Sequence, residues 1–385
     1  MAYTLDEVAF LATHTDDIAA ATAGLAFTRS SLLDDVAVLR ARFGEHGRAV
    51  TELAQARRSA TAHGKFPADW LTDLDAAQQA TPQVVAAQRA ARLRRVLGAD
   101  ALIHDVTCSV GTEGASISGR YLGSDLDPVR LAMARHNLGA DAWLVRADAT
   151  VPASRGADAI VADPARRAGG RRITHPDQLL PPLPDLLAAW PGQELAVKCA
   201  PGLDFSDWDG LVSLVSVDGG VKEACLYTPG LADGERREAI VISGGEVDRL
   251  TDALPDDVGA GEPGRYLIDP DGAVVRAGLV RHYAAREGLW MLDERIAYLT
   301  GDDIPAGRSG FPVEQIVPLK KLKAALGSDV GSLEILVRGV DVDPDVLRKK
   351  LKLRGSRPAA VVCTRIGTQG VAIVCGPREH RPARN

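Results

Sequence analysis

The stretch Ala101-Leu-Ile-His-Asp105-Val-Thr-Cys-Ser-Val-Gly111-Thr-Glu-Gly114 decides the fold class of this chain. It reads as a short buried strand that ends at Asp105 and continues through a glycine-bearing turn into a helix. Three later apolar runs also end in an acidic residue, and these residues are Asp125, Asp148 and Asp163. Ligands of a doubly wound parallel sheet bind beyond the carboxyl ends of its strands. We therefore expect the four carboxylates to face one crevice that holds a single small ligand.

The composition limits the class of protein. A chain of 385 residues is too long for one ordinary hydrophobic core, so its length predicts two or three domains. A content of 46% hydrophobic and 25% charged residues is usual for a soluble globular protein. Five scattered cysteines without a Cys-x-x-Cys pair argue against a disulfide framework and a zinc site. The sequence offers no signal peptide and no apolar run long enough to span a membrane. We expect a cytoplasmic protein without a metal or a membrane partner, and its oligomeric state stays open.

The net charge of −6 is unevenly distributed along the chain. Residues 318–385 hold 14 Lys and Arg against 6 Asp and Glu, a balance of +8 that leaves −14 for residues 1–317. The cations gather in two clusters, Lys320, Lys321 and Lys323, then Arg348, Lys349, Lys350, Lys352, Arg354 and Arg357. Dense cations favour contact with nucleic-acid phosphates, whereas a solvated helix face is the plainer alternative.

Three domains are expected. Residues 1–97 are rich in Ala, Leu and Arg, and they predict an all-helical domain in which we find no chemistry. Thr81-Pro82 opens a helix over 83–97, and Gly98 ends it. Residues 98–245 alternate short apolar runs with helical segments, which is typical of βαβ units. Residues 246–385 read as a mixed α+β domain.

Some local expectations follow from the pattern. A proline-rich helix is predicted over 179–190, and 221–227 fits either a strand or a helical turn. Residues 239–243 read as an antiparallel strand that closes the second domain. In the third domain, helices are predicted over 318–326 and 344–353, and paired strands over 359–364 and 370–375.

The turn after Asp105 suits a nucleoside cofactor. Gly111 and Gly114 let the backbone come close to a ligand, and a helix start there would favour negative charge. Asp125, twenty residues after Asp105, is placed to accept hydrogen bonds from ribose hydroxyls, and Asp148 from an adenine amino group. For each Asp alone, helix capping is the alternative. An NAD site is disfavoured because Thr107 and Ser109 stand where the first two glycines of G-x-G-x-x-G would fall.

These residues resemble a known family. Asp-Val-Thr-Cys-Ser-Val-Gly-Thr is similar to the first motif of class I S-adenosylmethionine-dependent methyltransferases, especially RNA-modifying ones that read Asp-Leu-(Phe/Tyr)-Cys-Gly-Val-Gly-Thr. Over residues 82–385 the chain resembles bacterial methyltransferases with a C-terminal THUMP-like domain, to which 347–355 would belong. The resemblance implies a Rossmann-like α/β sheet, S-adenosylmethionine as cofactor and RNA as partner. The cofactor-binding residues that it implies are Asp105, Thr107, Gly111, Gly114, Asp125, Leu126, Asp148 and Ala149.

The fourth motif, Asp163-Pro164-Ala165-Arg166, decides the methyl acceptor in such enzymes. Amino-methylating relatives often carry Asp/Asn-Pro-Pro and an aromatic residue that stacks on the base, and this chain lacks that aromatic. The resemblance implies catalytic roles for Asp163, Pro164 and Arg166, and a guanine nitrogen of tRNA or rRNA as first choice of acceptor. The arginines at 166, 167, 171 and 172 fit RNA phosphates, although a solvated loop is equally compatible.

Other functions stay open. Asp-Pro-Ala-Arg is also similar to the motif of RNA uridine C5-methyltransferases, whose cysteine nucleophile would correspond to Cys199, with Lys198 beside it to lower the thiol pKa. A buried, inert cysteine is the favoured interpretation of Cys199. A small-molecule methyltransferase and a non-catalytic RNA-binding scaffold are the rivals from other classes.

Overall fold

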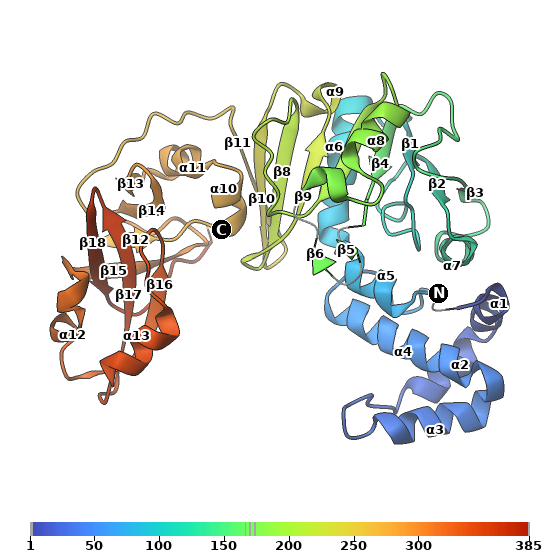
Figure 1. Ribbon diagram of the computed structural model, residues 1–385, viewed down its shortest axis with the longest axis horizontal. Helices are drawn as coiled ribbons and strands as arrows, with labels where there is room; N and C mark the ends of the chain where they lie inside the picture. The colour runs from blue at the N-terminus through green and yellow to red at the C-terminus, as the bar shows by residue number, and fades with distance from the viewer. Residues whose placement is uncertain (1–2, 166, 169–170, 173–174, 384–385) are drawn as a thin grey trace. The chain divides into compact units, whose positions relative to one another are not determined.

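The computed structural model describes residues 3–165, 167–168, 171–172 and 175–383, and of 167, 168, 171, 172 and 176 it describes only the backbone (Figure 1). The chain forms two compact units. Unit 1 comprises Met1–Val215 and Lys222–Gly234, and unit 2 comprises Ser216–Val221 and Glu235–Asn385. The division into three domains at 97/98 and 245/246 stays a prediction.

Unit 1 begins with helices. Thr4 opens the first of them with a capping box, because its hydroxyl accepts from the backbone N–H of Glu7 and Glu7 accepts in return. Asp73 caps a later one through the N–H of Ala76 at 2.6 Å. The helices are α1 (Leu5–Thr13), α2 (Thr15–Thr22), α3 (Leu32–Phe43), α4 (Gly47–Ala62), α5 (Leu74–Gln79) and α6 (Gln83–Leu97). The predicted helix over 83–97 is confirmed.

The helical segment shares its core with the sheet that follows. Leu11, Leu39 and Leu53 pack in one buried cluster with Val110, from the turn after the first strand, and with Met133 of α7 (Pro128–Leu138). The N-terminal helices therefore form one apolar core with the part of the chain that carries the expected ligand turn.

The strands that lie wholly or mainly in unit 1 follow the order β8-β9-β7-β4-β1-β2-β3, with β3, β2, β1, β4 and β7 parallel and β9 antiparallel to β7. Strands β1 and β4 are buried along their whole length, as expected of parallel strands covered on both faces. This arrangement is the α/β sheet that the sequence predicts. The strands are β1 (Leu102–Asp105), β2 (Arg120–Asp125), β3 (Trp143–Arg146), β4 (Ala159–Ala162), β7 (Glu194–Cys199), β8 (Leu211–Val217) and β9 (Gly220–Tyr227).

Some local predictions were wrong. No helix follows the turn after β1, because 106–116 forms consecutive turns held by bonds such as Ala115 N to Gly111 O at 3.2 Å. Gly111 has φ +94°, which is not a helical conformation. The segment before β2 is also too short for added helical hydrogen bonds to offset the unfavourable free energy of helix nucleation. The proline-rich helix is only α8 (Leu183–Ala189), because Pro182 begins it as N-cap. Residues 221–227 are strand. Five short elements complete the unit: α9 (Pro229–Ala232), β5 (Arg167–Ala168), β6 (Arg171–Arg172) and the 3₁₀ turns Gly44–His46 and Pro176–Gln178.

Unit 2 contains the antiparallel hairpin of β10 (Arg237–Ser243) and β11 (Glu246–Thr251) and a separate 8-stranded sheet. Gly244 and Gly245 both have positive φ at the hairpin turn, a conformation that favours glycine. The path of the second sheet is β13-β14-β12-β15-β18-β17-β16, with β19 beside β15. Its strands are β12 (Tyr266–Ile268), β13 (Trp290–Asp293), β14 (Ile296–Gly301), β15 (Ser309–Pro318), β16 (Val330–Val337), β17 (Arg357–Ile366), β18 (Gln369–Cys375) and β19 (Glu379–His380). The helices of the unit are α10 (Gly272–Arg276), α11 (Val280–Glu287), α12 (Leu322–Ala325) and α13 (Pro344–Leu351).

Alternation along β17 divides the core of this sheet into two faces. Val362 packs with Phe311 in one buried cluster, whereas its neighbour Val361 packs with Leu322 of α12 and Leu351 of α13 in another. Helices α12 and α13 therefore cover the same face of the sheet. That shared face brings together the two basic clusters of the sequence.

Candidate functional site

A cavity of about 200 Å³ lies in unit 1 at the carboxyl ends of the parallel strands. Asp105 ends β1, Asp125 ends β2 and Asp163 follows β4, and all three line the cavity together with Thr107. The strand order β4-β1-β2 brings these residues to one edge of the sheet. The remaining lining residues are Ala76, Gln79, Ala80, Thr81, Cys108, Ser109, Val110, Thr112, Glu113, Arg130, Ala165, Leu180 and Lys198.

Asp105 is held at the floor of the cavity. Its Oδ1 accepts from the backbone N–H of Thr107 at 3.1 Å, and its Oδ2 accepts from the hydroxyl of Tyr121 at 3.1 Å. Burial, followed by the nearby charge of Glu113, raises the pKa of Asp105 to about 8. The carboxyl group is thus poised to change its protonation state when a charged ligand binds.

Asp125 shapes the turn as well as lining it. Its Oδ2 accepts from the N–H of Ser109 at 3.0 Å, and its Oδ1 accepts from the N–H of Asp127 at 2.9 Å. Ser109 has φ +49°, a left-handed conformation that side chains seldom adopt. Arg130 donates to the Ser109 hydroxyl at 3.1 Å. A carboxylate offers about four lone-pair sites, so Asp125 keeps acceptor capacity for ligand hydroxyls.

Asp163 meets a buried lysine. Nζ of Lys198 donates to Oδ2 of Asp163 at 2.5 Å, and the N–H of Asp163 donates to the Thr107 hydroxyl at 2.6 Å. Burial alone would lower the pKa of Lys198, but Asp163 and then Glu223 raise it above its ordinary value. Lys198 is therefore a fixed positive charge beside Asp163. Among the described residues, no hydrogen bond reaches the other oxygen of that carboxylate.

The two glycines of the turn serve packing. A Cβ at Gly111 would lie 2.8 Å from Leu138, and one at Gly114 would lie 2.8 Å from the ring of Tyr121. Neither glycine lines the cavity. Their absent side chains let the turn pack against α7 and β2, and close approach to a cofactor stays a prediction for both.

Other predicted residues lie outside the lining of the cavity. Asp148 accepts from the N–H and the hydroxyl of Thr150, at 2.8 and 2.7 Å, which stabilises a turn, and no helix begins there for it to cap. Leu126 is exposed, and Ala149 is buried with its carbonyl bonded to Trp190. Pro164 does not line the cavity. Arg166 lies outside the described residues, as do the side chains of the arginines at 167, 171 and 172.

Cys199 is fully buried and does not line the cavity. Successive side chains of a strand point to opposite faces, so the orientation that brings Lys198 to Asp163 directs Cys199 away from it. This placement matches the inert cysteine favoured from the sequence, and it gives no support to a thiolate nucleophile at this position.

The sequence analysis missed the contribution of the helical segment. Arg89 of α6 lies on the helix face that also buries Val85, Ala86 and Leu93. Its guanidinium binds both oxygens of Glu113, a residue of the cavity. The position of this arginine among the apolar residues of one helix face could have revealed the contact from the sequence. A buried guanidinium requires a buried hydrogen-bond partner.

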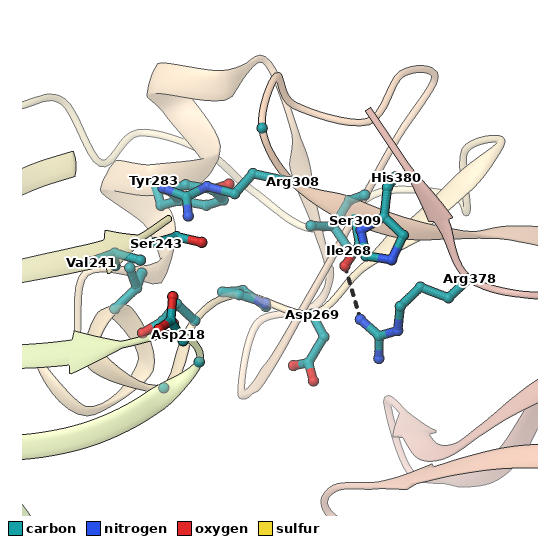
Figure 2. A pocket seen from close by; sticks show the side chains of 16 residues that line it. Asp218, Val241, Ser243, Ile268, Asp269, Tyr283, Arg308, Ser309, Arg378 and His380 are labelled. Atoms are coloured by element: carbon teal, nitrogen blue, oxygen red, sulfur yellow. Dashed lines mark hydrogen bonds between the residues drawn. The ribbon is translucent and has the colours of Figure 1, made fainter. Parts of the chain in front are cut away.

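Unit 2 holds a second and larger cavity, of about 530 Å³ (Figure 2). Arg308, Arg378, Asp218 and Asp269 contribute charges to its lining. Both arginines already have protein partners, because Arg308 pairs with Asp248 while Arg378 pairs with Glu334 and donates to Ser309. This cavity lacks the row of strand-end carboxylates, so we place the candidate site in unit 1.

A basic surface lies on the face of the unit 2 sheet that α12 and α13 cover. We define it by seven exposed residues, Lys320, Lys321, Lys323, Lys349, Lys350, Lys352 and Arg354. None of the seven forms an ion pair with another described residue, whereas Arg348 pairs with Asp345, and Arg357 with Asp329 and Glu314. Seven cations without internal partners are available for an anionic ligand.

Comparisons with known proteins agree with this geometry. Two curated relatives from Mycobacterium tuberculosis strains, both described as uncharacterized S-adenosylmethionine-dependent methyltransferases, are 47% identical over 366 residues, covering 88% of this chain and 99% of theirs. A putative methyltransferase structure from Porphyromonas gingivalis superposes with a TM-score of 0.68 at 16% identity, covering 97% of this chain and 99% of that one. A family model described as THUMP domain-like matches residues 308–377.

The described residues contain no group of His, Cys, Asp or Glu side chains arranged to hold a metal ion. No helix among them combines the length and the apolar character needed to cross a bilayer.

Proposed function

This chain belongs to the S-adenosylmethionine-dependent methyltransferases, and on that premise we propose that it methylates a base in tRNA or rRNA, with a guanine nitrogen as first choice of acceptor. The observation that carries the RNA part is the basic surface on the domain that matches the THUMP-like family model. Bound S-adenosylmethionine supplies an electrophilic methyl group on a sulfonium.

The unit 1 cavity fits that cofactor. Asp105 would accept from its ammonium group and Asp125 from its ribose hydroxyls, as a carboxylate with free lone pairs can do. The turn 106–116, fixed by Asp125 through Ser109, would bring backbone groups close to the ligand. Asp148 stays our proposed partner for the adenine amino group, although Thr150 occupies it here.

Asp163 and Lys198 would act on the acceptor. Asp163 has one oxygen bound by Lys198 and a second that can accept from an N–H of the base. Lys198 holds this carboxylate in place, so that it can orient the base and take up the proton that the nitrogen loses after methylation. Holding the nucleophile in line can itself supply about 7–11 kcal/mol of the barrier. Arg166, which lies outside the described residues, stays our proposal for holding the base or a phosphate.

RNA would be held by phosphate contacts at the basic surface. Each phosphate neutralised by Lys or Arg adds affinity that falls as salt rises. Phosphate contacts position the RNA without selecting its sequence, so selectivity would come from the cavity in unit 1.

The test is incubation of the purified protein with total RNA and methyl-labelled S-adenosylmethionine, followed by nucleoside analysis. Label in a methylated guanine of tRNA or rRNA is the expected result. Label in 5-methyluridine would instead restore the cysteine mechanism at Cys199. Label absent from RNA but present in a low-molecular-weight extract would establish a small-molecule methyltransferase and overturn the proposal.

A further inference from the structure

We propose that the helical segment before β1 is a working part of the cofactor cavity, in which 76–81 form a wall and Arg89 is a positioning residue for the turn 106–116. This inference rests on the placement of S-adenosylmethionine in the unit 1 cavity proposed above. It assigns a role to a segment whose sequence carries no recognisable chemistry.

The wall is built from the end of α5 and the link to α6. Ala76, Gln79, Ala80 and Thr81 all line the cavity, together with the residues at the strand ends. Lys65 fixes the end of α5 by donating to the carbonyls of Ala77 and Gln78, at 2.7 and 2.5 Å. Anchored at its last turn, this short helix is held as a defined boundary of the cavity.

Arg89 joins three parts of unit 1. Its Nε and Nη2 donate to the two oxygens of Glu113, at 3.0 and 2.8 Å, and its Nη1 donates to Glu223 of β9 at 2.7 Å. Thr81 donates to the other oxygen of Glu223 at 3.1 Å. Helix α6, the wall, the turn and β9 therefore share one hydrogen-bonded network.

The network is almost fully withdrawn from water. Arg89 is 2% exposed, and Glu113 and Glu223 are buried with it. Burial lowers the pKa of Arg89, but Glu113 and Glu223 together raise it well above its ordinary value. Buried ion pairs of this kind add little to the free energy of folding. They fix geometry, because the N–H groups of the planar guanidinium and the carboxylate oxygens form all their hydrogen bonds in one arrangement only.

A second connection holds the turn from the opposite side. Asn137 of α7 donates to the carbonyls of Leu71 and Val110, both at 2.9 Å, and accepts from the N–H of Leu71 at 2.8 Å. Leu71 precedes α5, and Val110 belongs to the turn. The helical segment is thus connected to the middle of the turn at two positions, Val110 through Asn137 and Glu113 through Arg89.

The role of the wall is tested by placing a bulky side chain in the cavity from it. Gln79 is exposed and lines the cavity, whereas Gln78 is exposed and does not. Gln79→Trp is expected to weaken S-adenosylmethionine binding at least tenfold by calorimetry, with Gln78→Trp within twofold of wild type. Equal affinities for both variants would show that the segment is no part of the binding site.

The positioning role is tested with Arg89→Lys, which keeps the charge but loses the paired bonds to Glu113. In the cofactor-free protein, amide hydrogen exchange of 106–116 is expected to rise at least tenfold, while β1 and β4 keep their protection. Binding of S-adenosylmethionine should weaken in parallel. Arg89→Met removes the charge as well as the hydrogen bonds, so its effects on exchange and affinity should be larger. Circular dichroism checks that this variant folds. Wild-type exchange and affinity in Arg89→Lys would overturn the assignment.

Asp125→Asn separates the two proposals. If this variant binds S-adenosylmethionine as wild type does, the cofactor does not lie in the unit 1 cavity and both proposals fall. If Asp125→Asn loses affinity while Gln79→Trp and Arg89→Lys do not, the cofactor placement stands and the role of the helical segment is overturned.

Discussion

Nζ of Lys198 lies 2.5 Å from Oδ2 of Asp163, and the lysine side chain is only 3% exposed while the aspartate side chain is 27% exposed. The cation is buried beneath a carboxylate that faces the cavity. The buried ammonium group directs the carboxylate toward whatever enters the cavity.

The first prediction concerns this pair. Lys198→Met removes the cation at similar side-chain length, so the Asp163 carboxylate loses its partner and its orientation. Methyl transfer in a single turnover is expected to slow at least tenfold, about 1.4 kcal/mol. Cofactor affinity should stay within threefold. Lys222→Met, at an exposed lysine of β9, is the control, and equal rates for the two variants would refute the role of Lys198.

The second prediction is a pH dependence of stability. The pKa of Asp105 is raised from 3.8 to about 8, so the folded protein keeps a proton that the unfolded chain loses near pH 4. That contribution is complete below pH 4 and disappears as the pH rises through 8. The unfolding free energy of wild type minus that of Asp105→Asn should therefore fall between pH 4 and 8 in urea titrations. A difference independent of pH would contradict the raised pKa.

The third prediction concerns Asp125. Asn has one acceptor oxygen, so Asp125→Asn cannot hold the N–H groups of both Ser109 and Asp127. Hydrogen bonds to a charged acceptor contribute about 1.5–3 kcal/mol, which predicts a loss of S-adenosylmethionine affinity of about 10–150-fold. Asp127→Asn, at the N-cap of α7, keeps an effective capping side chain and should leave affinity and thermal stability close to those of wild type.

The fourth prediction separates crowding from backbone strain. Gly111 and Gly139 have φ +94° and +91°, but a Cβ at Gly111 would lie 2.8 Å from Leu138 and one at Gly139 meets open space. Both alanine variants place a Cβ on a backbone with positive φ and are strained, and only Gly111→Ala must also displace a side chain of the core. We expect its melting temperature to fall further, by an additional amount equivalent to about 1–3 kcal/mol. Equal losses would show that Leu138 moves freely.

The fifth prediction concerns the basic surface. Lys349→Glu combined with Lys350→Glu should lower RNA affinity and reduce the slope of log affinity against log salt by about 1 or more. Lys222→Glu, outside the surface, should leave both unchanged. Filter binding at several salt concentrations measures this, and an unchanged slope in the double variant would place the RNA elsewhere.

The strand ends could be predicted from the sequence because two strong regularities coincide there. Short buried runs such as 159–162 admit few structures other than a parallel strand, and parallel strands carry their next residues to one edge. Asp105, Asp125 and Asp163 follow from those two facts. Asp148 has the same sequence signature, but Thr150 two residues later captures its carboxylate.

The remaining features depend on contacts between distant residues. Whether the turn becomes a helix is decided by Gly111 and by the nearness of β2, which a helical pattern does not measure. The pairing of Arg89 with Glu113 and Glu223 spans 24 and 134 positions, so only the folded chain reveals it. The common face of α12 and α13 likewise depends on the pairing of β15 to β18, although both segments were predicted as helices.

The chain leaves unit 1 after Val215, returns at Lys222 and leaves again after Gly234. A single proteolytic cut therefore cannot yield two intact halves. A fragment that begins at Glu235 lacks Ser216–Val221, whose Asp218 lines the unit 2 cavity, and the complementary fragment keeps those residues at the turn between β8 and β9. Residues 308–377, which match the THUMP-like family model, lie wholly in the second segment of unit 2, whereas exchange of the complete unit between enzymes would require three junctions to be grafted.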